Sequence, residues 1–378
     1  MVQKQEKLHE GRVPPCEVVG THLKFRHMMI KEIFEEPQVT TAFLAEGVKQ
    51  IQEIADAVSS KRYEMVYITG SGTSYHAGLA AQYAISTLTR FITSLIPASE
   101  FPSWIPSNPT RKSLLIAISQ SGESSDILAA AKAALEKDMD VLAITNTQDS
   151  SLMKMAQYTL LTRAGEEFAV TATKSYIAQL MALFLLSAQL AEAEGTRATE
   201  TRRLRQQLFK APEVIAETIN SVNDKIQQLA RKYSQQNFFF LLGSGPNYAT
   251  ALEGALKLKE ACNIFAEGFA SREFLHGPIQ LVDEKTSLFF IPDEDQLTSA
   301  IREIKSVRAF DASVLSIFER KDEQLKAVSN ELIWVPKGFP KVFSPMIYII
   351  PLQLFAYYSS VARGLNPDKP EKLTKVVK

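Results

Sequence analysis

The sequence predicts an α/β fold built from two tandem copies of one parallel-sheet domain. Short apolar runs rich in β-forming residues alternate with amphipathic helical stretches, a pattern typical of a parallel sheet covered by helices on both faces. An internal repeat is the second observation, because Gly70 and Gly243 each follow an apolar run and lie 173 residues apart. The length of 378 residues fits two or three domains of about 150 residues.

Composition argues against several classes of protein. The 42 basic and 42 acidic side chains give a formal net charge of zero, whereas nucleic-acid-binding proteins usually carry a basic surplus. Two cysteines, Cys16 and Cys262, are too few for a disulfide scaffold or a cysteine-based zinc finger. Apolar runs such as 347–354 are shorter than the roughly 20 residues of a membrane span, and the polar N-terminus lacks a signal-peptide core. We therefore expect a cytoplasmic protein with neither nucleic-acid nor membrane partners.

The repeat extends well beyond the two glycines. Glu100 and Glu273 are also 173 residues apart, and Gln179 and Gln353, each in an apolar helical pattern, are 174 apart. Such a long offset excludes a solenoid repeat and indicates two copies of one domain. The expected boundaries are 1–44 for an arm and helix, 45–206 for the first copy, 207–362 for the second copy, and 363–378 for a tail.

Four strands are expected in each copy. They are residues 66–69, 114–118, 141–145 and 158–162 in the first copy, and 238–242, 286–291, 313–317 and 331–335 in the second. Residues 124–137 have a helical pattern, and residues 191–207 predict a charged helix that joins the copies. Residues 1–20 have two adjacent prolines and little periodicity, so we expect an arm or a disordered segment there.

Two loops of the first copy have the composition of a phosphate site. The sequence Gly-Ser-Gly-Thr-Ser (70–74) follows a strand and opens a helix, and Ser-Gln-Ser-Gly-Glu-Ser (119–124) lies between a strand and a helix. Glycines let the backbone approach a ligand, hydroxyls donate hydrogen bonds, and a helix N-terminus attracts an anion. A serine-rich helix cap is the alternative explanation. No Gly-x-x-x-x-Gly-Lys-Ser/Thr motif occurs, which argues against a P-loop nucleotidase.

The second copy carries acid–base groups instead. At the offset of the serine loop it reads Ile-Pro-Asp-Glu-Asp (291–295), and these acidic residues would repel a phosphate. Further upstream, Glu253, Lys257 and Glu260 share one face of a predicted helix. Taken alone, that spacing is typical of a solvated ion-pair face. His276 stands before a Gly-Pro turn, where a lone histidine is more often structural, and the polar segment 366–375 has the composition of a disordered tail.

Taken together, these motifs resemble the double-domain sugar isomerase (SIS) family, and the isomerase half of glutamine:fructose-6-phosphate amidotransferase in particular. The resemblance covers residue 28 to the end. Its five ordered motifs are Gly-Ser-Gly-Thr-Ser, Ser-Gln-Ser-Gly-Glu-Ser, Ala-Leu-Glu-Gly-Ala-Leu-Lys-Leu-Lys-Glu, His-Gly-Pro and the tail Asn-Pro-Asp-Lys-Pro-Glu-Lys-Leu-Thr-Lys. It implies that both domains are flavodoxin-like αβα sandwiches and that the tail closes over the site as a lid.

The resemblance also implies a role for individual residues. Glu260 corresponds to the base that moves a proton between C1 and C2, with Lys257 beside it. His276 corresponds to a histidine linked to ring opening and contributed across the interface of a homodimer, and Lys375 to a tail lysine that closes over the open-chain sugar. No metal or cofactor is implied. The residues implied in sugar-phosphate binding are Gly72, Thr73, Ser74, Ser119, Gln120, Ser121, Ser124, Val170, Ala172 and Thr173.

One departure from the amidotransferase pattern narrows the expected reaction. Fewer than 50 residues precede the first repeat, and Cys16 is internal, so the given sequence shows no glutaminase domain headed by cysteine. We therefore expect an amino-sugar-phosphate deaminase, which converts glucosamine 6-phosphate into fructose 6-phosphate and ammonia. A fructosamine 6-phosphate deglycase that releases glucose 6-phosphate is the alternative enzyme. A non-enzymatic sugar-phosphate sensor is the alternative outside enzymes, although it would have no need of Glu260, His276 and Lys375.

Overall fold

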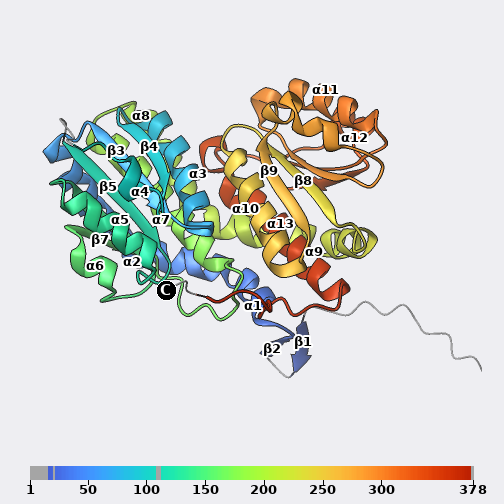
Figure 1. Ribbon diagram of the computed structural model, residues 1–378, viewed down its shortest axis with the longest axis horizontal. Coiled ribbons are helices and arrows are strands. Elements are labelled where there is room, and N and C mark those ends of the chain that lie inside the picture. The colour runs from blue at the N-terminus through green and yellow to red at the C-terminus, as the bar shows by residue number, and fades with distance from the viewer. Residues whose placement is uncertain (1–15, 20–21, 108–111, 376–378) are drawn as a thin grey trace, which may run out of the picture.

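The protein folds into two halves that lie side by side and repeat the same order of elements (Figure 1). The structure is a computed structural model that describes residues 16–19, 22–107 and 112–375. Elements before the first sheet are β1 (Cys16–Val19), β2 (His22–Phe25), α1 (Met28–Phe34) and α2 (Glu36–Lys61). Elements of the first half are β3 (Met65–Gly70), α3 (Thr73–Leu88), β4 (Ile92–Pro97), α4 (Phe101–Trp104), β5 (Ser113–Ser119), α5 (Ser125–Leu135), β6 (Asp140–Thr145), α6 (Ser151–Met155), β7 (Tyr158–Leu161) and α7 (Lys174–Ala193).

The second half follows two connecting helices, α8 (Ala198–Leu208) and α9 (Ala211–Lys232). Its strands are β8 (Phe238–Gly243), β9 (Phe265–Ala270), β10 (Ser287–Ile291), β11 (Ser313–Phe318) and β12 (Glu331–Trp334). Its α-helices are α10 (Asn247–Cys262), α11 (Leu297–Arg308), α12 (Glu323–Val328) and α13 (Pro345–Ala362). Short 3₁₀ helices η1 (Glu273–His276), η2 (Pro278–Leu281), η3 (Glu294–Gln296) and η4 (Lys341–Phe343) complete it.

Each half has a five-stranded sheet in which all neighbouring strands are parallel. The strand orders are β4-β3-β5-β6-β7 and β9-β8-β10-β11-β12. Counted along the chain within each half, both orders are 2-1-3-4-5, the flavodoxin-like arrangement. The predicted α/β class with two tandem parallel-sheet domains is therefore confirmed.

One strand in each half was missing from the sequence prediction. β4 and β9 are edge strands that pair only with β3 and β8. Their sequences, Ile-Thr-Ser-Leu-Ile-Pro and Phe-Ala-Glu-Gly-Phe-Ala, mix polar and apolar residues, because an edge strand is not buried along its whole length. The predicted inner strands are fully or nearly buried, which is why their apolar runs were visible in the sequence.

Two buried helices, α7 and α13, lie at the centre of the two halves. Both are long and apolar enough to cross a bilayer by length and composition, but 83% and 100% of their apolar windows are buried inside the protein. α7 packs against α2 and α3, and α13 packs against α9 and α10. Neither helix was identified as a possible membrane span from uninterrupted apolar runs in the sequence. Their burial shows that both are core helices.

One expectation about the connections is wrong, and for the two terminal segments the structure describes what composition alone left open. The charged helix predicted over 191–207 is interrupted, since α7 ends at Ala193, Gly195 adopts φ +69°, and α8 begins at Ala198. In the N-terminal arm, residues 16–19 form β1, which pairs antiparallel with β2, and the rest of the arm up to residue 15 lies outside the described residues. The polar tail is not disordered up to residue 375, because it runs along α1 toward the first half (Figure 1).

Candidate active site

A cavity of about 310 Å³ lies at the carboxyl ends of β3 and β5. In a sheet of this order, these two neighbouring parallel strands flank the point where the strand order reverses, and the loops that follow them diverge and leave room for a ligand. The cavity is lined by predicted site residues from five separate segments, namely Gly72, Thr73, Ser74, Ser119, Gln120, Ser121, Ser124, Val170, Ala172, Glu260 and Lys375. The fold therefore brings together most of the residues that the motifs singled out.

Two helix N-termini face this cavity without a side-chain cap. α3 begins directly after Gly72, whose φ of +53° is a left-handed conformation that suits glycine. α5 begins after Ser124, and the hydroxyl of Ser124 makes no capping hydrogen bond. The alternative explanation, a serine-rich helix cap, therefore does not hold for the Ser124 side chain, whereas the Ser119 and Ser121 hydroxyls accept hydrogen bonds from the backbone N–H groups of Gly122 and Glu123 at 3.0 and 3.2 Å. The uncapped backbone N–H groups and the positive ends of both helix dipoles favour an anion at this place.

The repeated glutamine of the first half holds one of the cavity residues. Gln179 on α7 donates a hydrogen bond of 3.0 Å to the Ser74 hydroxyl, and both side chains are buried. Its counterpart Gln353 on α13 donates to the carbonyl oxygen of Thr173 at 3.4 Å. The glutamines thus connect the central helices with the loops around the cavity.

The corresponding loop of the second half is filled by a carboxylate of the protein itself. Asp293 is buried against Gly245, the equivalent of Gly72, and a Cβ atom at Gly245 would lie 2.7 Å from its Oδ2. Its backbone N–H donates to the Ser244 hydroxyl at 2.8 Å, and Lys341 forms an ion pair of 2.7 Å with its carboxylate. An internal anion therefore occupies the space that stays open in the first half.

The helix α10 of the second half carries a buried row of charges into the cavity wall. Glu253 and Lys257 have 0% exposed side chains, and only Glu260, at 20%, reaches the cavity. Lys257 Nζ lies 3.1 Å from Glu253 and 2.7 Å from Glu260. The solvated ion-pair face suggested by spacing alone is therefore wrong, because α3 covers this face of α10.

The pKa values of the buried pair follow from these contacts. Burial opposes the charged form of Glu253, but the Lys257 charge and the His76 hydrogen bond outweigh it and lower the pKa of Glu253. Burial also opposes the charge of Lys257, but Glu253 and Glu260 raise its pKa above the ordinary value. Lys257 therefore stays cationic, and it also donates a hydrogen bond of 3.1 Å to the hydroxyl of Thr73.

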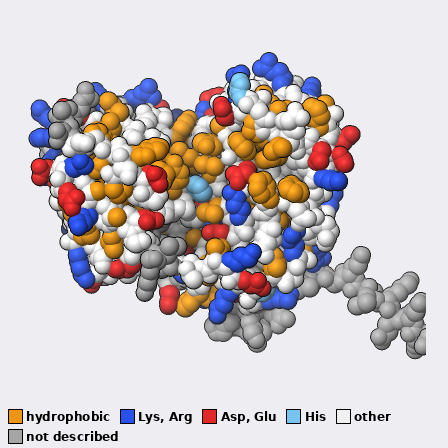
Figure 2. Space-filling view, viewed as in Figure 1, with side chains coloured by type: hydrophobic (Ala, Val, Ile, Leu, Met, Phe, Trp, Pro, Cys, Tyr) orange, Lys and Arg blue, Asp and Glu red, His pale blue; other side chains and the backbone are white. Residues whose placement is uncertain are grey.

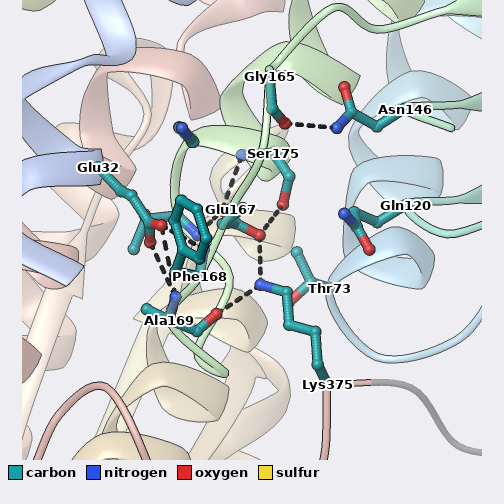
Figure 3. Close-up of polar contacts among 12 residues, drawn as sticks. Glu32, Thr73, Gln120, Asn146, Gly165, Glu167, Phe168, Ala169, Ser175 and Lys375 are labelled. Carbon is teal, nitrogen blue, oxygen red and sulfur yellow. Dashed lines mark hydrogen bonds and ion pairs between the residues drawn. The ribbon is translucent and has the colours of Figure 1, made fainter. Parts of the chain in front are cut away.

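Glu167 is a cavity residue that the sequence analysis did not single out. It lies on the loop before α7, is buried, and accepts hydrogen bonds from the backbone N–H groups of Thr173 and Ser175 at 3.0 and 3.1 Å. Its Oε2 lies 2.6 Å from Lys375 Nζ, which also donates to the Ala169 carbonyl (Figure 3). Burial opposes its ionisation, but the Lys375 charge and these donors lower its pKa. Its position among charged loop residues gave no periodic signal in the sequence.

A second carboxylate lies behind this loop. Glu32 on α1 is buried and accepts hydrogen bonds from the backbone N–H groups of Phe168 and Ala169 (Figure 3). Burial and the neighbouring Glu167 charge raise the pKa of Glu32 to about 7. Glu36, one turn further along, is fully buried, and its burial raises its pKa well above the ordinary value.

Three predicted site residues do not line the cavity. Thr173 is buried beneath it as the residue before α7, and Lys257 lies behind Thr73 and Glu260. His276 is exposed on η1 and lies outside the residues that line the cavity. Over the described ranges, no group of three or more His, Cys, Asp or Glu side chains is arranged to hold a metal ion.

A larger groove of about 510 Å³ lies between the halves, beside α3, β4 and the start of α10. None of its lining residues carries a charge, and Figure 2 shows apolar side chains gathered where the halves meet. Because this groove offers nothing to hold an anion, the smaller cavity is the candidate active site.

Comparisons with known proteins agree with this geometry. The family described as SIS domain matches residues 60–188 and 232–363. The chain is 36% identical, over 93% of its length, to the glutamine–fructose-6-phosphate aminotransferase [isomerizing] of Pyrococcus horikoshii, and it spans 58% of that relative. The C-terminal domain of glucosamine-fructose-6-phosphate aminotransferase from Francisella tularensis superimposes with a TM-score of 0.83 at 27% identity, over 92% of this chain and 99% of that one.

A further solved structure shares the fold. Glucosamine-6-phosphate deaminase from Thermotoga maritima superimposes with a TM-score of 0.72 at 23% identity, over 93% of this chain and 99% of that one. The family match falls on both halves and includes both parallel sheets. With two repeats of the same flavodoxin-like unit, the chain belongs to the SIS-domain family.

Proposed function

We propose that this protein transfers a proton between C1 and C2 of a 6-phosphorylated amino sugar, with glucosamine 6-phosphate deaminated to fructose 6-phosphate and ammonia. The observation that carries the proposal is the position of Glu260, a carboxylate of the second half that lines the same cavity as the serine loops of the first half. The names of the relatives, which refer to fructose 6-phosphate and to isomerisation, support a sugar phosphate as substrate.

In this proposal the first half anchors the phosphate. The hydroxyls of Ser74, Ser119, Ser121 and Ser124, the amide of Gln120 and the uncapped N-termini of α3 and α5 supply neutral donors to it. An anion held by several such donors needs no basic side chain, because the helix dipoles and N–H groups already favour the negative charge. The backbone near Val170, Ala172 and Thr173 would contact the sugar hydroxyls.

Glu260 then acts as the base. It removes the C2 proton from the open-chain aldehyde of glucosamine 6-phosphate. The C2–H electron pair forms a double bond between C1 and C2, and the carbonyl oxygen on C1 takes up a proton, which gives an enaminol. Return of the proton from Glu260 to C1, with loss of one proton from the amino nitrogen, gives the 2-imine of fructose 6-phosphate. Water adds to this imine, the C2–N bond breaks, and ammonia leaves with fructose 6-phosphate as the other product. A positioned carboxylate of this kind contributes typically about 10²–10⁴-fold in rate.

Two cations would assist this proton transfer. Lys257 holds Glu260 through the ion pair of 2.7 Å, which fixes the carboxylate against the cavity. Lys375, held by Glu167, would neutralise negative charge that develops on the sugar oxygen in the enaminol. Neither of these roles requires a redox change.

The test compares wild type, Glu260→Gln and the control Glu267→Gln. Glu267 lies on β9 in a surface ion pair with Lys259, outside the cavity. Ammonia release and deuterium incorporation at C1 of fructose 6-phosphate in D₂O are measured with glucosamine 6-phosphate. We expect Glu260→Gln to lose about 10²–10⁴-fold in kcat while a fluorescence or calorimetric titration still shows sugar-phosphate binding. Wild-type turnover by Glu260→Gln would contradict the assignment of the base.

The same assay distinguishes the alternatives. Much higher kcat/KM with fructosamine 6-phosphates would favour a deglycase, and binding of phosphosugars without turnover of any would favour a sensor. The proposed dimer is tested separately, since His276 is exposed in the single chain and is proposed to reach the cavity of a second copy. Sedimentation should give a dimer, and a fully active monomer would contradict the shared site.

A further inference from the structure

A row of polar side chains runs behind the cavity from the first half to the second. His76 on α3 places Nδ1 at 2.7 Å from Oε2 of Glu253 on α10. The other oxygen of Glu253 accepts a hydrogen bond of 3.0 Å from Thr73, which lines the cavity at the start of α3. Four residues, His76, Glu253, Lys257 and Glu260, therefore form one continuous chain of contacts that ends at the proposed base.

Lys257 is shared between two carboxylates within this row. Its Nζ lies 3.1 Å from Glu253 and 2.7 Å from Glu260, and its side chain is completely buried. A buried ammonium group divides its attraction between the carboxylates that face it, and the division depends on how well each carboxylate is satisfied by other donors. Glu253 has two other hydrogen-bond donors, Thr73 and His76, so it attracts the Lys257 ammonium less strongly than it would without them.

We propose that His76 is a positioning residue that acts through Glu253 and Lys257 on Glu260. In this proposal, the assignment of Glu260 as the base rests on the proposed function, whereas the contacts among the four residues do not. Without the imidazole, Oε2 of Glu253 would be buried with one partner fewer. The Lys257 ammonium would then move toward Glu253 and away from Glu260, and the base would lose both its orientation and its neighbouring positive charge.

Other groups around the row limit what could substitute for His76. Tyr176 on α7 faces Glu253, but its buried hydroxyl has no hydrogen-bond partner within the described structure. The ring of Tyr75 lies 6.0 Å from the His76 ring and presents an edge to it. On the cavity side, Glu260 shares the lining with Asp126, Glu167 and Lys375. Among these groups, His76 on α3 is the residue whose ring nitrogen lies within hydrogen-bond distance of Glu253.

The test uses three substitutions at residue 76. Asparagine places an amide N–H the same number of bonds from Cα as Nδ1, glutamine places it one bond further, and alanine removes it. We expect His76→Ala to lower kcat about 10- to 100-fold, to change KM less than about threefold, and to move the acidic limb of the pH profile of kcat/KM upward by about one unit. His76→Asn should restore the profile and His76→Gln should not. Ser86→Ala, an exposed site on the same helix, is the control.

A second measurement does not depend on activity. The unfolding free energies of His76→Ala, Glu260→Gln and the double variant form a double-mutant cycle between the two ends of the row, which Glu253 and Lys257 join. Non-additive changes are expected. An inactive wild type with a non-additive cycle would contradict the proposed function and leave the row intact. Additive changes, or a pH profile of His76→Ala identical to wild type, would overturn the role of His76.

Discussion

Lys375 and Glu167, 208 residues apart in the chain, meet in an ion pair of 2.6 Å at the wall of the cavity. Glu167 is completely buried, and Lys375 has only 26% of its side chain exposed. The contact joins the last described turn of the tail to the loop before α7. It also places a positive charge beside the proposed substrate position.

Replacing Lys375 by methionine tests this contact. The variant should lower kcat about 10- to 100-fold, because the tail loses the ion pair that positions it and the cavity loses a cation. Lys372→Met, an exposed neighbour in the same tail, should keep wild-type kcat. Thermal melting of both variants shows whether folding is intact. Equal kcat values for the two variants would exclude the proposed role of Lys375.

The tail is anchored a few residues earlier by Asp368. Its carboxylate accepts hydrogen bonds from the backbone N–H groups of Met28 and Met29 at 2.9 and 2.8 Å, and so caps α1 from 340 residues away. Asp368→Ala should reduce the unfolding free energy by about 0.5–2 kcal/mol, as for other lost helix caps. Urea titration measures the change, with Asp368→Asn expected to lose less. The exposed Glu371→Ala is the control, and equal losses in both alanine variants would show that capping is not the cause.

Glu32 should make stability depend on pH. Its pKa is about 7 in the folded protein, because of burial and the neighbouring Glu167 charge, against an ordinary value of 4.5. Between pH 4.5 and 7 the folded state therefore binds more protons than the unfolded state, so stability falls as pH rises through this window. Glu32→Gln keeps an acceptor for Phe168 and Ala169 but cannot ionise.

The variant should therefore gain stability relative to wild type as pH rises from 5 to about 8. Urea unfolding at several pH values measures the difference, and Glu53→Gln on the exposed face of α2 is the control. Parallel curves for wild type and Glu32→Gln would contradict the raised pKa.

The serine loop is tested by Ser121→Ala. If Ser121 donates to the phosphate, its loss should mostly raise KM, since a hydrogen bond to a charged group is worth about 1.5–3 kcal/mol, or roughly 10- to 100-fold. Ser125→Ala, at an exposed position outside the cavity, should leave KM unchanged. Steady-state kinetics with glucosamine 6-phosphate measures both. An unchanged KM in Ser121→Ala would remove this residue from the site.

The fold class could be predicted because its signals are local. Inner strands such as β5 and β10 are buried on both faces and therefore appear as uninterrupted apolar runs. The edge strands β4 and β9 were not predicted, because polar residues or a glycine interrupt their apolar residues, whereas the opposite edge strands β7 and β12 were predicted. The break at Gly195 was missed for a related reason, since the charged pattern continues across it.

The candidate site was only partly visible in the sequence. The serine loop and the spacing of Glu253, Lys257 and Glu260 were recognisable as motifs. Periodicity showed that these three residues share a face of α10, but it could not show that α3 covers this face and makes the ion pairs buried. Glu167, Glu32 and His76 had no motif at all, because their importance comes from partners far away in the chain.

By itself, the sequence determined the two-copy α/β architecture and the difference between a hydroxyl-rich first half and a carboxylate-bearing second half. Only the tertiary structure decided that Asp293 fills the loop of the second half, that the tail reaches Glu167, and that His76 contacts Glu253. The physical reason is that strand burial and helix periodicity produce patterns among residues that are close together in the sequence. The partner of a buried charge depends on how segments far apart in the chain pack against one another.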